Sequence, residues 1–185
     1  LFIHNILKTS GVILVVIFLF CLTALLLPAD PSIRNGLLYG KTAKDSLLLN
    51  TSDRRIIFIG GSNLSFGLNS KMIEDSLKIN PINTAIHANI GLEYMLLNTL
   101  RYIREDDIIV IAPEYDHFIG EAVHGAREMV ITLADVDNFE LLNDLSIKQL
   151  KRLLIQSPRY CLEKLNPWSY FIPIDKYGIY GKYSF

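Results

Sequence analysis

The chain has 185 residues, of which 50% are apolar and 20% charged, and this composition excludes a wholly disordered protein. Its 18 Lys and Arg and 19 Asp and Glu give a formal net charge of −1. Because no run of basic residues stands out, we expect no nucleic-acid partner. The two cysteines, Cys21 and Cys161, are too few for a disulfide framework or a cysteine-based zinc site.

An apolar segment near the N-terminus predicts a membrane anchor. Residues 9–27 carry no charge and are mostly Val, Ile, Leu and Phe. Their number is close to the roughly 20 residues that a helix needs to cross a hydrocarbon core. A cleaved signal peptide would have a shorter apolar core and a small-residue cleavage site, and residues 25–30 offer no good one. We therefore expect residues 1–27 to form an uncleaved anchor, with the lipid bilayer as partner through residues 9–27.

The charges that flank this segment favour a cytoplasmic main domain. Only Lys8 precedes it, whereas Arg34, Lys41 and Lys44 follow it, and basic residues are enriched on the cytoplasmic side of membrane helices. The chain begins at Leu1 rather than Met, so charges upstream could reverse that count. The flanking residues by themselves leave the orientation open.

Residues 28–53 show little periodicity and contain scattered Pro, Gly, Asn, Ser and Thr, so we expect a stalk or linker there. The folded domain should then occupy residues 54–185. Within it, three apolar segments bounded by Gly and Pro predict strands, and helical spacing of apolar residues predicts helices between them. The strands are expected at 56–59, 82–87 and 108–112, and the helices at 70–77 and 92–103.

This order of strands and helices predicts an α/β fold with a mainly parallel sheet and right-handed crossovers. We expect a flavodoxin-like three-layer sandwich, in which the first strand lies between the second and the third. About five strands are typical of this architecture, and only three are predicted here. The region after Met129 is expected to be mainly helical. Residues 167–185, rich in aromatic side chains, are expected to pack in the core or at the membrane interface.

Ligands bind beyond the carboxyl ends of the strands in such sheets. Three segments are predicted at that edge, residues 60–63, 87–91 and 113–117, and they hold most of the reactive side chains of the domain. Ser62 follows a strand and two glycines, a position in which its hydroxyl could act as a nucleophile beside free backbone N–H groups. It could equally cap the next helix. A phosphate-binding loop is a further alternative, although the lysine and glycine patterns of known phosphate loops are missing.

The segment Ile56–Asn63, an apolar strand leading into Gly-Gly-Ser-Asn, resembles the first sequence block of the SGNH (GDSL-like) hydrolases. The segment Asn83–Asn89 is similar to their second block, with Ala88 in place of the oxyanion glycine and Asn89 as the following polar residue. An alternative register places the block at residues 89–91. Residues 81–118 resemble a membrane-anchored branch of this family that is found in bacterial envelopes.

The resemblance implies a serine esterase or O-acyltransferase that acts on acyl esters of an envelope glycan, without a cofactor. Ser62 would be the nucleophile, and the N–H groups of Ser62 and Ala88 would stabilise the oxyanion, with Gly61, Asn89 and Glu114 lining the site. The main domain would lie on the extracytoplasmic side, against the flanking-charge count. The alternative is a non-catalytic binding or assembly module of the envelope.

The chain departs from the family pattern at several positions. Gly61 replaces the aspartate of the first block, and Glu114 stands where the third block has an oxyanion asparagine. The last block, Asp-x-x-His, supplies the catalytic base, but no histidine follows His124, so we expect that block beyond Phe185. His87 or His117 could substitute as the base. A helical face formed by His117, Glu121 and His124 could bind a metal, but nearby glycines weaken that helix and we expect no metal site.

Overall fold

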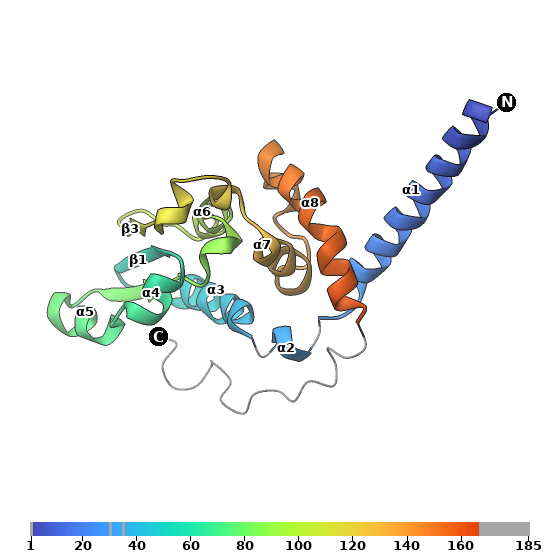
Figure 1. Cartoon of the computed structure of the whole chain (residues 1–185). Coiled ribbons are helices and arrows are strands. Elements are labelled where there is room, and N and C mark those ends of the chain that lie inside the picture. Colours follow the sequence, from blue (N-terminus) through green and yellow to red (C-terminus); the bar gives the residue numbers. More distant parts are fainter. Residues whose placement is uncertain (1, 30, 35, 167–185) are drawn as a thin grey trace.

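The computed structural model describes residues 2–29, 31–34 and 36–166, and the aromatic segment 167–185 lies outside them. A long helix, α1 (Phe2–Leu26), projects from an α/β domain that holds the other elements (Figure 1). The α-helices of the domain are α2 (Pro31–Arg34), α3 (Gly40–Asn50), α4 (Ser62–Gly67), α5 (Ser70–Leu77), α6 (Leu92–Leu100), α7 (Arg127–Ile131) and α8 (Ile147–Lys164).

Three parallel strands form the sheet, in the order β2-β1-β3. They are β1 (Arg55–Gly60), β2 (Asn80–Asn83) and β3 (Ile108–Ala112), so the predicted central position of the first strand is confirmed. All six residues of β1 are buried, which explains the continuous apolar run at residues 56–59. The three predicted strands are all present, and the described part of the chain contains these three rather than the about five that are typical of a flavodoxin-like sheet.

The second strand is shorter than the predicted segment 82–87. It ends at Asn83, whose side-chain oxygen accepts a hydrogen bond from the amide of Ala85 at 3.1 Å. The amide group of the same side chain donates to the carbonyl oxygen of Leu64 at 3.0 Å. An asparagine that bonds to the backbone two residues on forms a turn, so the chain leaves the sheet here.

The structure corrects the expectation of an irregular stalk at residues 28–53. Helix α3 falls within this segment and packs against the sheet, and Leu48 is fully buried in the main core. Lys44 is also buried, and its ammonium group donates to the carbonyl oxygens of Asn83 (3.0 Å) and Ala85 (2.6 Å). Because long lysine stems replace apolar residues on its inner face, α3 lacks a clear apolar period. The folded domain therefore begins before residue 54.

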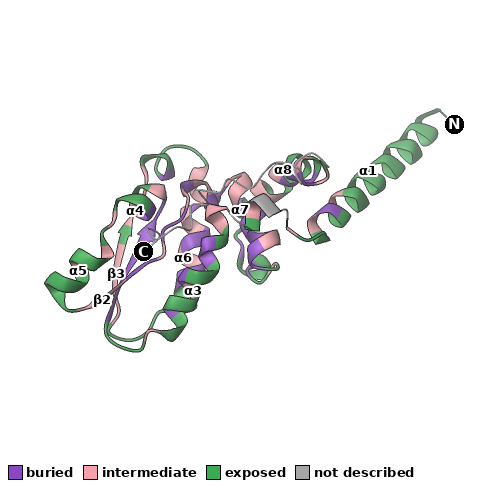
Figure 2. Ribbon diagram, turned by 90° about the horizontal axis from the view of Figure 1, so that it is seen from below, coloured by how far each residue is buried: buried purple, intermediate pink, exposed green. Residues whose placement is uncertain are grey.

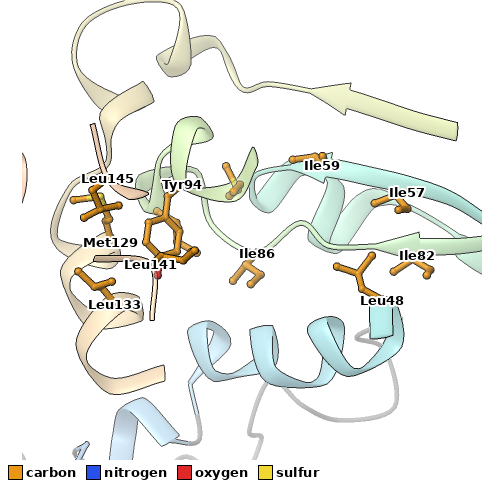
Figure 3. Packing of buried hydrophobic residues seen from close by; sticks show 12 residues of the cluster. Leu48, Ile57, Ile59, Ile82, Ile86, Tyr94, Met129, Leu133, Leu141 and Leu145 are labelled. Carbon is orange, nitrogen blue, oxygen red and sulfur yellow. The ribbon is translucent and has the colours of Figure 1, made fainter. Parts of the chain in front are cut away.

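The hydrophobic core joins both halves of the domain (Figure 3). Ile57 and Ile59 of β1 contribute to it from the sheet, and Tyr94 contributes from α6. The region after Met129 is mainly helical, as predicted, and adds Met129, Leu133, Leu141 and Leu145 to the same cluster. The strands and the C-terminal helices therefore form one packed unit.

Helix α1 is different from the rest of the chain because nearly all of its residues are exposed (Figure 2). With 25 residues, this helix is long enough and apolar enough to cross a membrane. Among the described residues, the C-terminal end of α1 is the part that meets the domain: Ala24 is buried there, and the Sγ atom of Cys161 donates to the carbonyl oxygen of Cys21 at 3.4 Å. The sequence prediction of an N-terminal helix of spanning length is confirmed.

Candidate functional site

The carboxyl ends of β1 and β3 bring Ser62 and Glu114 together. The parallel pairing of these strands ends with Gly60 beside Ala112, so both chains leave the sheet at the same edge. The Oγ atom of Ser62 donates a hydrogen bond to Oε1 of Glu114 at 3.1 Å. The backbone amide of Asn63 donates to the same carboxylate oxygen at 3.2 Å. The serine and the carboxylate therefore form a hydrogen-bonded pair at the sheet edge where ligands bind in such folds.

Gly61 makes this pair possible because it has no side chain. A Cβ atom at position 61 would lie 2.7 Å from Cδ of Glu114 and 3.0 Å from Cβ of Ala88, and it would overlap the carboxylate oxygen. The segment after β2 therefore also reaches the site, through Ala88. Gly61, Ala88 and Glu114, which were predicted to line one site, therefore lie close to one another and to Ser62.

His117 is hydrogen-bonded to the backbone of Glu114 and Ala88 and not to Ser62. Its ring is buried; Nδ1 accepts a hydrogen bond from the backbone amide of Glu114 at 3.1 Å. The other ring nitrogen, Nε2, lies 2.9 Å from the carbonyl oxygen of Ala88 and must donate there, since a carbonyl only accepts. His117 thus joins the loops after β2 and β3, and neither nitrogen is free to act as a base for Ser62.

The loop after β2 is held by its own contacts. His87 uses Nδ1 to accept the amide of Asn89 at 3.1 Å, and the carbonyl oxygen of Asn89 accepts the amide of Ala126 at 2.8 Å. Gly91 has a φ of +91°, and a Cβ atom there would lie 2.5 Å from the backbone nitrogen of Gly125. The segment at residues 124–126 therefore packs tightly against this loop and fixes its position; we call this segment the clamp. In the described residues, no hydrogen bond joins His87 or Asn89 to Ser62.

The three residues considered for a metal site lie apart from one another. His117 is bonded to Ala88 as above, Glu121 pairs with Arg152 at 3.2 Å, and Nδ1 of His124 lies 2.9 Å from a carboxylate oxygen of Glu93. His117 ends one 3₁₀ turn (Tyr115–His117), whereas Glu121 precedes and His124 ends a second one (Ala122–His124). The three residues therefore do not share one helix, because Gly120 takes a positive φ between the two turns. Within residues 2–166, apart from 30 and 35, no group of three such side chains could hold a metal ion.

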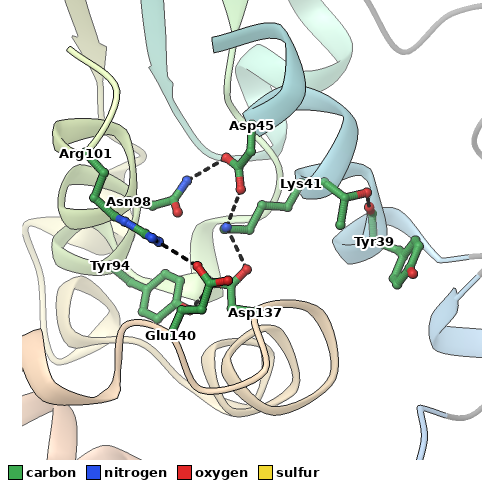
Figure 4. Close-up of polar contacts among 9 residues, drawn as sticks. Tyr39, Lys41, Asp45, Tyr94, Asn98, Arg101, Asp137 and Glu140 are labelled. Atoms are coloured by element: carbon green, nitrogen blue, oxygen red, sulfur yellow. Dashed lines mark hydrogen bonds and ion pairs between the residues drawn. The ribbon is translucent and has the colours of Figure 1, made fainter. Parts of the chain in front are cut away.

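A buried ionic cluster joins α3, α6 and the turn after α7 (Figure 4). Lys41 pairs with Asp45 at 2.6 Å and with Asp137 at 2.7 Å, and the hydroxyl of Tyr94 donates to Asp137. Burial raises the pKa of Asp137, and Lys41 partly opposes that change. Burial also raises the pKa of Tyr94, and the charge of Asp137 adds to the effect. Sequence reasoning missed this cluster because Lys41 and Asp137 are 96 residues apart and belong to no motif.

Comparisons with models of known protein families, with curated proteins and with solved structures find no significant match to this chain.

Proposed function

We propose that this chain is a membrane-anchored, SGNH-like serine esterase or O-acyltransferase that acts on acyl esters of an envelope glycan. The observation that carries the proposal is the hydrogen bond from Ser62 to Glu114 at the carboxyl edge of the central strand. A nucleophilic hydroxyl needs an acceptor for its proton within hydrogen-bond reach. Glu114 is the one titratable side chain to which Ser62 is hydrogen-bonded in the described part of the chain.

In the proposed reaction, Oγ of Ser62 attacks the acyl carbon and its proton passes to Glu114. The tetrahedral intermediate breaks the ester C–O bond, and the leaving hydroxyl takes the proton back from Glu114. The acyl group then resides on Ser62 until water or a second hydroxyl group removes it by the same steps in reverse. The resemblance assigns oxyanion stabilisation to the N–H groups of Ser62 and Ala88. The position of Ala88 against Gly61 supports this assignment.

We also propose a complete fold for the domain and a side of the membrane on which it lies. The parallel sheet of three strands supports a flavodoxin-like three-layer sandwich, and α1 supports a single-pass anchor. We propose that the main domain lies on the extracytoplasmic side, where an envelope glycan is accessible. This side follows from the family resemblance.

A fluorophosphonate probe tests the nucleophile in the full chain, purified in detergent. We expect the probe to label Ser62, identified by peptide mass spectrometry, and Ser62→Ala to abolish the label. Ser65→Ala is the matched control, because Ser65 lies in the same helix but is buried, and it should leave the labelling intact. Glu114→Gln preserves the side-chain volume and removes the carboxylate, so it should slow labelling by about 10²-fold or more. A folded wild-type chain that is not labelled would contradict the proposal.

A non-catalytic binding module is the second candidate. It is favoured by the engagement of His87 and His117 with backbone groups, which leaves Ser62 without a histidine partner in the described residues. For this candidate we expect a glycan ligand to bind without turnover, and Ser62→Ala to change affinity rather than remove an activity. Binding of acylated glycan fragments, measured by calorimetry alongside product analysis, separates the two candidates.

A further inference from the structure

One face of helix α8 packs against the domain and against α1. Gln149, Ser157, Tyr160 and Cys161 are buried on this face. Lys164 is also buried, and its ammonium group donates to the carbonyl oxygen of Leu27 at 2.6 Å, beside the end of α1. α8 is therefore packed directly against the base of the helix that is long enough to cross a membrane.

The outer face of α8 combines apolar and basic residues. Ile147 is 85% exposed, Leu154 75% and Leu162 64%, which is unusual for large apolar side chains along one helix. Leu150 and Ile155 are exposed as well. The charged residues that α8 exposes, Lys148, Lys151 and Arg159, are all basic. Arg159 pairs with the half-buried Glu163 at 3.0 Å within the same helix.

The position of α8 relative to α1 suggests what covers this face. The two helices meet at their C-terminal ends, and both run from there toward the same side of the molecule in Figure 1. The rest of the domain lies on the other side of α8, where α7 packs against it. A bilayer that contains α1 would therefore meet α8 before it meets the strands.

We infer that the outer face of α8 lies on the surface of the same bilayer and binds anionic lipid headgroups. Helices that lie in a membrane interface bury apolar side chains to about 5–10 Å and place basic side chains at the headgroups. Lys and Arg close to an anionic bilayer surface are attracted to it electrostatically. The inference rests on the proposed anchoring by α1, and it assigns α8 the task of holding the domain in a defined orientation against the membrane.

The test uses the full chain in nanodiscs, with Cys21 and Cys161 replaced by Ser and an environment-sensitive fluorophore on one new cysteine. Leu154→Cys reports on α8, Val15→Cys reports on α1, and Met72→Cys, exposed on α5, is the matched control. Circular dichroism checks that each variant is folded. With nitroxide-labelled lipids in discs that contain anionic lipid, we expect quenching at position 154 to exceed quenching at position 72 by at least threefold.

Charge reversal tests the headgroup contact separately. In the Leu154→Cys background, Lys148→Glu with Lys151→Glu should reduce the quenching at position 154 to the level at position 72. Neutral lipids should also lower it. Quenching at position 15 without quenching at position 154 overturns the inference and leaves the anchor intact, whereas no quenching at position 15 contradicts the anchor itself. Quenching at 154 that is insensitive to lipid charge and to both substitutions overturns the role of the headgroups.

Discussion

Glu114 places its carboxyl group in the space that a side chain at position 61 would need. A Cβ atom on Gly61 would lie 2.7 Å from Cδ of Glu114, well inside van der Waals contact. These are two of the positions at which the chain departs from the SGNH pattern. They are complementary, because the residue with no side chain makes room for the longer acidic one. The carboxylate therefore reaches Ser62.

Substitution of Gly61 by Ala should damage the site and the fold together. We expect a loss of about 1–3 kcal/mol in the free energy of unfolding, because an added methyl group must displace Glu114 or the backbone. Fluorophosphonate labelling of Ser62 should slow in parallel. Gly67→Ala, at the other end of α4 from Gly61, is the control, since a Cβ atom there meets nothing within 4 Å, and it should leave both measurements almost unchanged. Equal behaviour of the two variants would contradict the steric argument.

The close approach of Gly91 to Gly125 predicts a second pair of variants. Gly91→Ala combines a positive φ with an overlap, whereas Gly120→Ala has a similar φ of +89° in open space. We expect Gly120→Ala to lower the free energy of unfolding, measured with a denaturant, by about 1 kcal/mol, because of backbone strain alone. Gly91→Ala should cost about 1–3 kcal/mol more, because the loop that carries Ala88 and Asn89 must move away from its clamp. Equal losses in the two variants would show that the clamp contributes nothing.

The buried ammonium group of Lys44 predicts a pH dependence of stability. Burial lowers the pKa of Lys44 from 10.5 to about 8. Between these values the unfolded chain binds more protons than the folded chain at this residue, so its contribution to stability rises with pH. Relative to Lys44→Met, wild-type stability should increase by about 2 kcal/mol between pH 7 and pH 9.5.

Denaturant unfolding of both proteins at the two pH values measures this change. Lys71→Met is the control, because Lys71 is exposed on α5 and pairs with Asp75. The difference between wild type and Lys71→Met should stay nearly constant over the same range. A constant difference between wild type and Lys44→Met would mean that Lys44 is not buried in solution.

A buried ion pair at the amino end of the sheet predicts a large loss of stability when it is broken. Arg55 is 1% exposed; it donates to Asp107 and to the carbonyl oxygens of Leu48 (2.5 Å) and Tyr102 (2.9 Å). Asp107→Asn should lower the free energy of unfolding by about 3–5 kcal/mol, because it leaves a buried guanidinium without its counter-charge.

The exposed pair of Arg101 and Glu140 is the comparison, and Glu140→Gln should lower the free energy of unfolding by less than about 1 kcal/mol.

The same buried pair predicts a pH dependence of stability. The hydrogen bond from Arg55 is the main cause that lowers the pKa of Asp107. Wild-type stability should therefore fall as the pH drops below about 4, where this carboxylate protonates in the unfolded chain. Thermal unfolding of the wild type and of both variants between pH 3 and pH 7 measures both effects. A loss of stability in Asp107→Asn that is no larger than the loss in Glu140→Gln would contradict the importance of the buried pair.

The sequence by itself determined the central part of the fold. The central strand of a parallel sheet is buried and needs a continuous apolar run, and β1 has one at residues 56–59, ended by two glycines. The edge strand β3 also has an apolar run, ended by a proline, although its residues are half-buried or exposed. The spacing of apolar residues likewise located α5 and α6, although α6 ends at Leu100 rather than at residue 103. These signals are local, because each depends on residues only a few positions apart.

Tertiary structure alone decided the contacts that give the site its chemistry. Ser62 and Glu114 are 52 residues apart and meet because of the register between β1 and β3. The turn that ends β2 at Asn83, and the packing of α3 through lysine side chains, depend in the same way on partners distant in sequence. Hydrogen bonds and ion pairs between distant segments leave no periodicity in the sequence, because the partner of each polar group is chosen only when the elements pack.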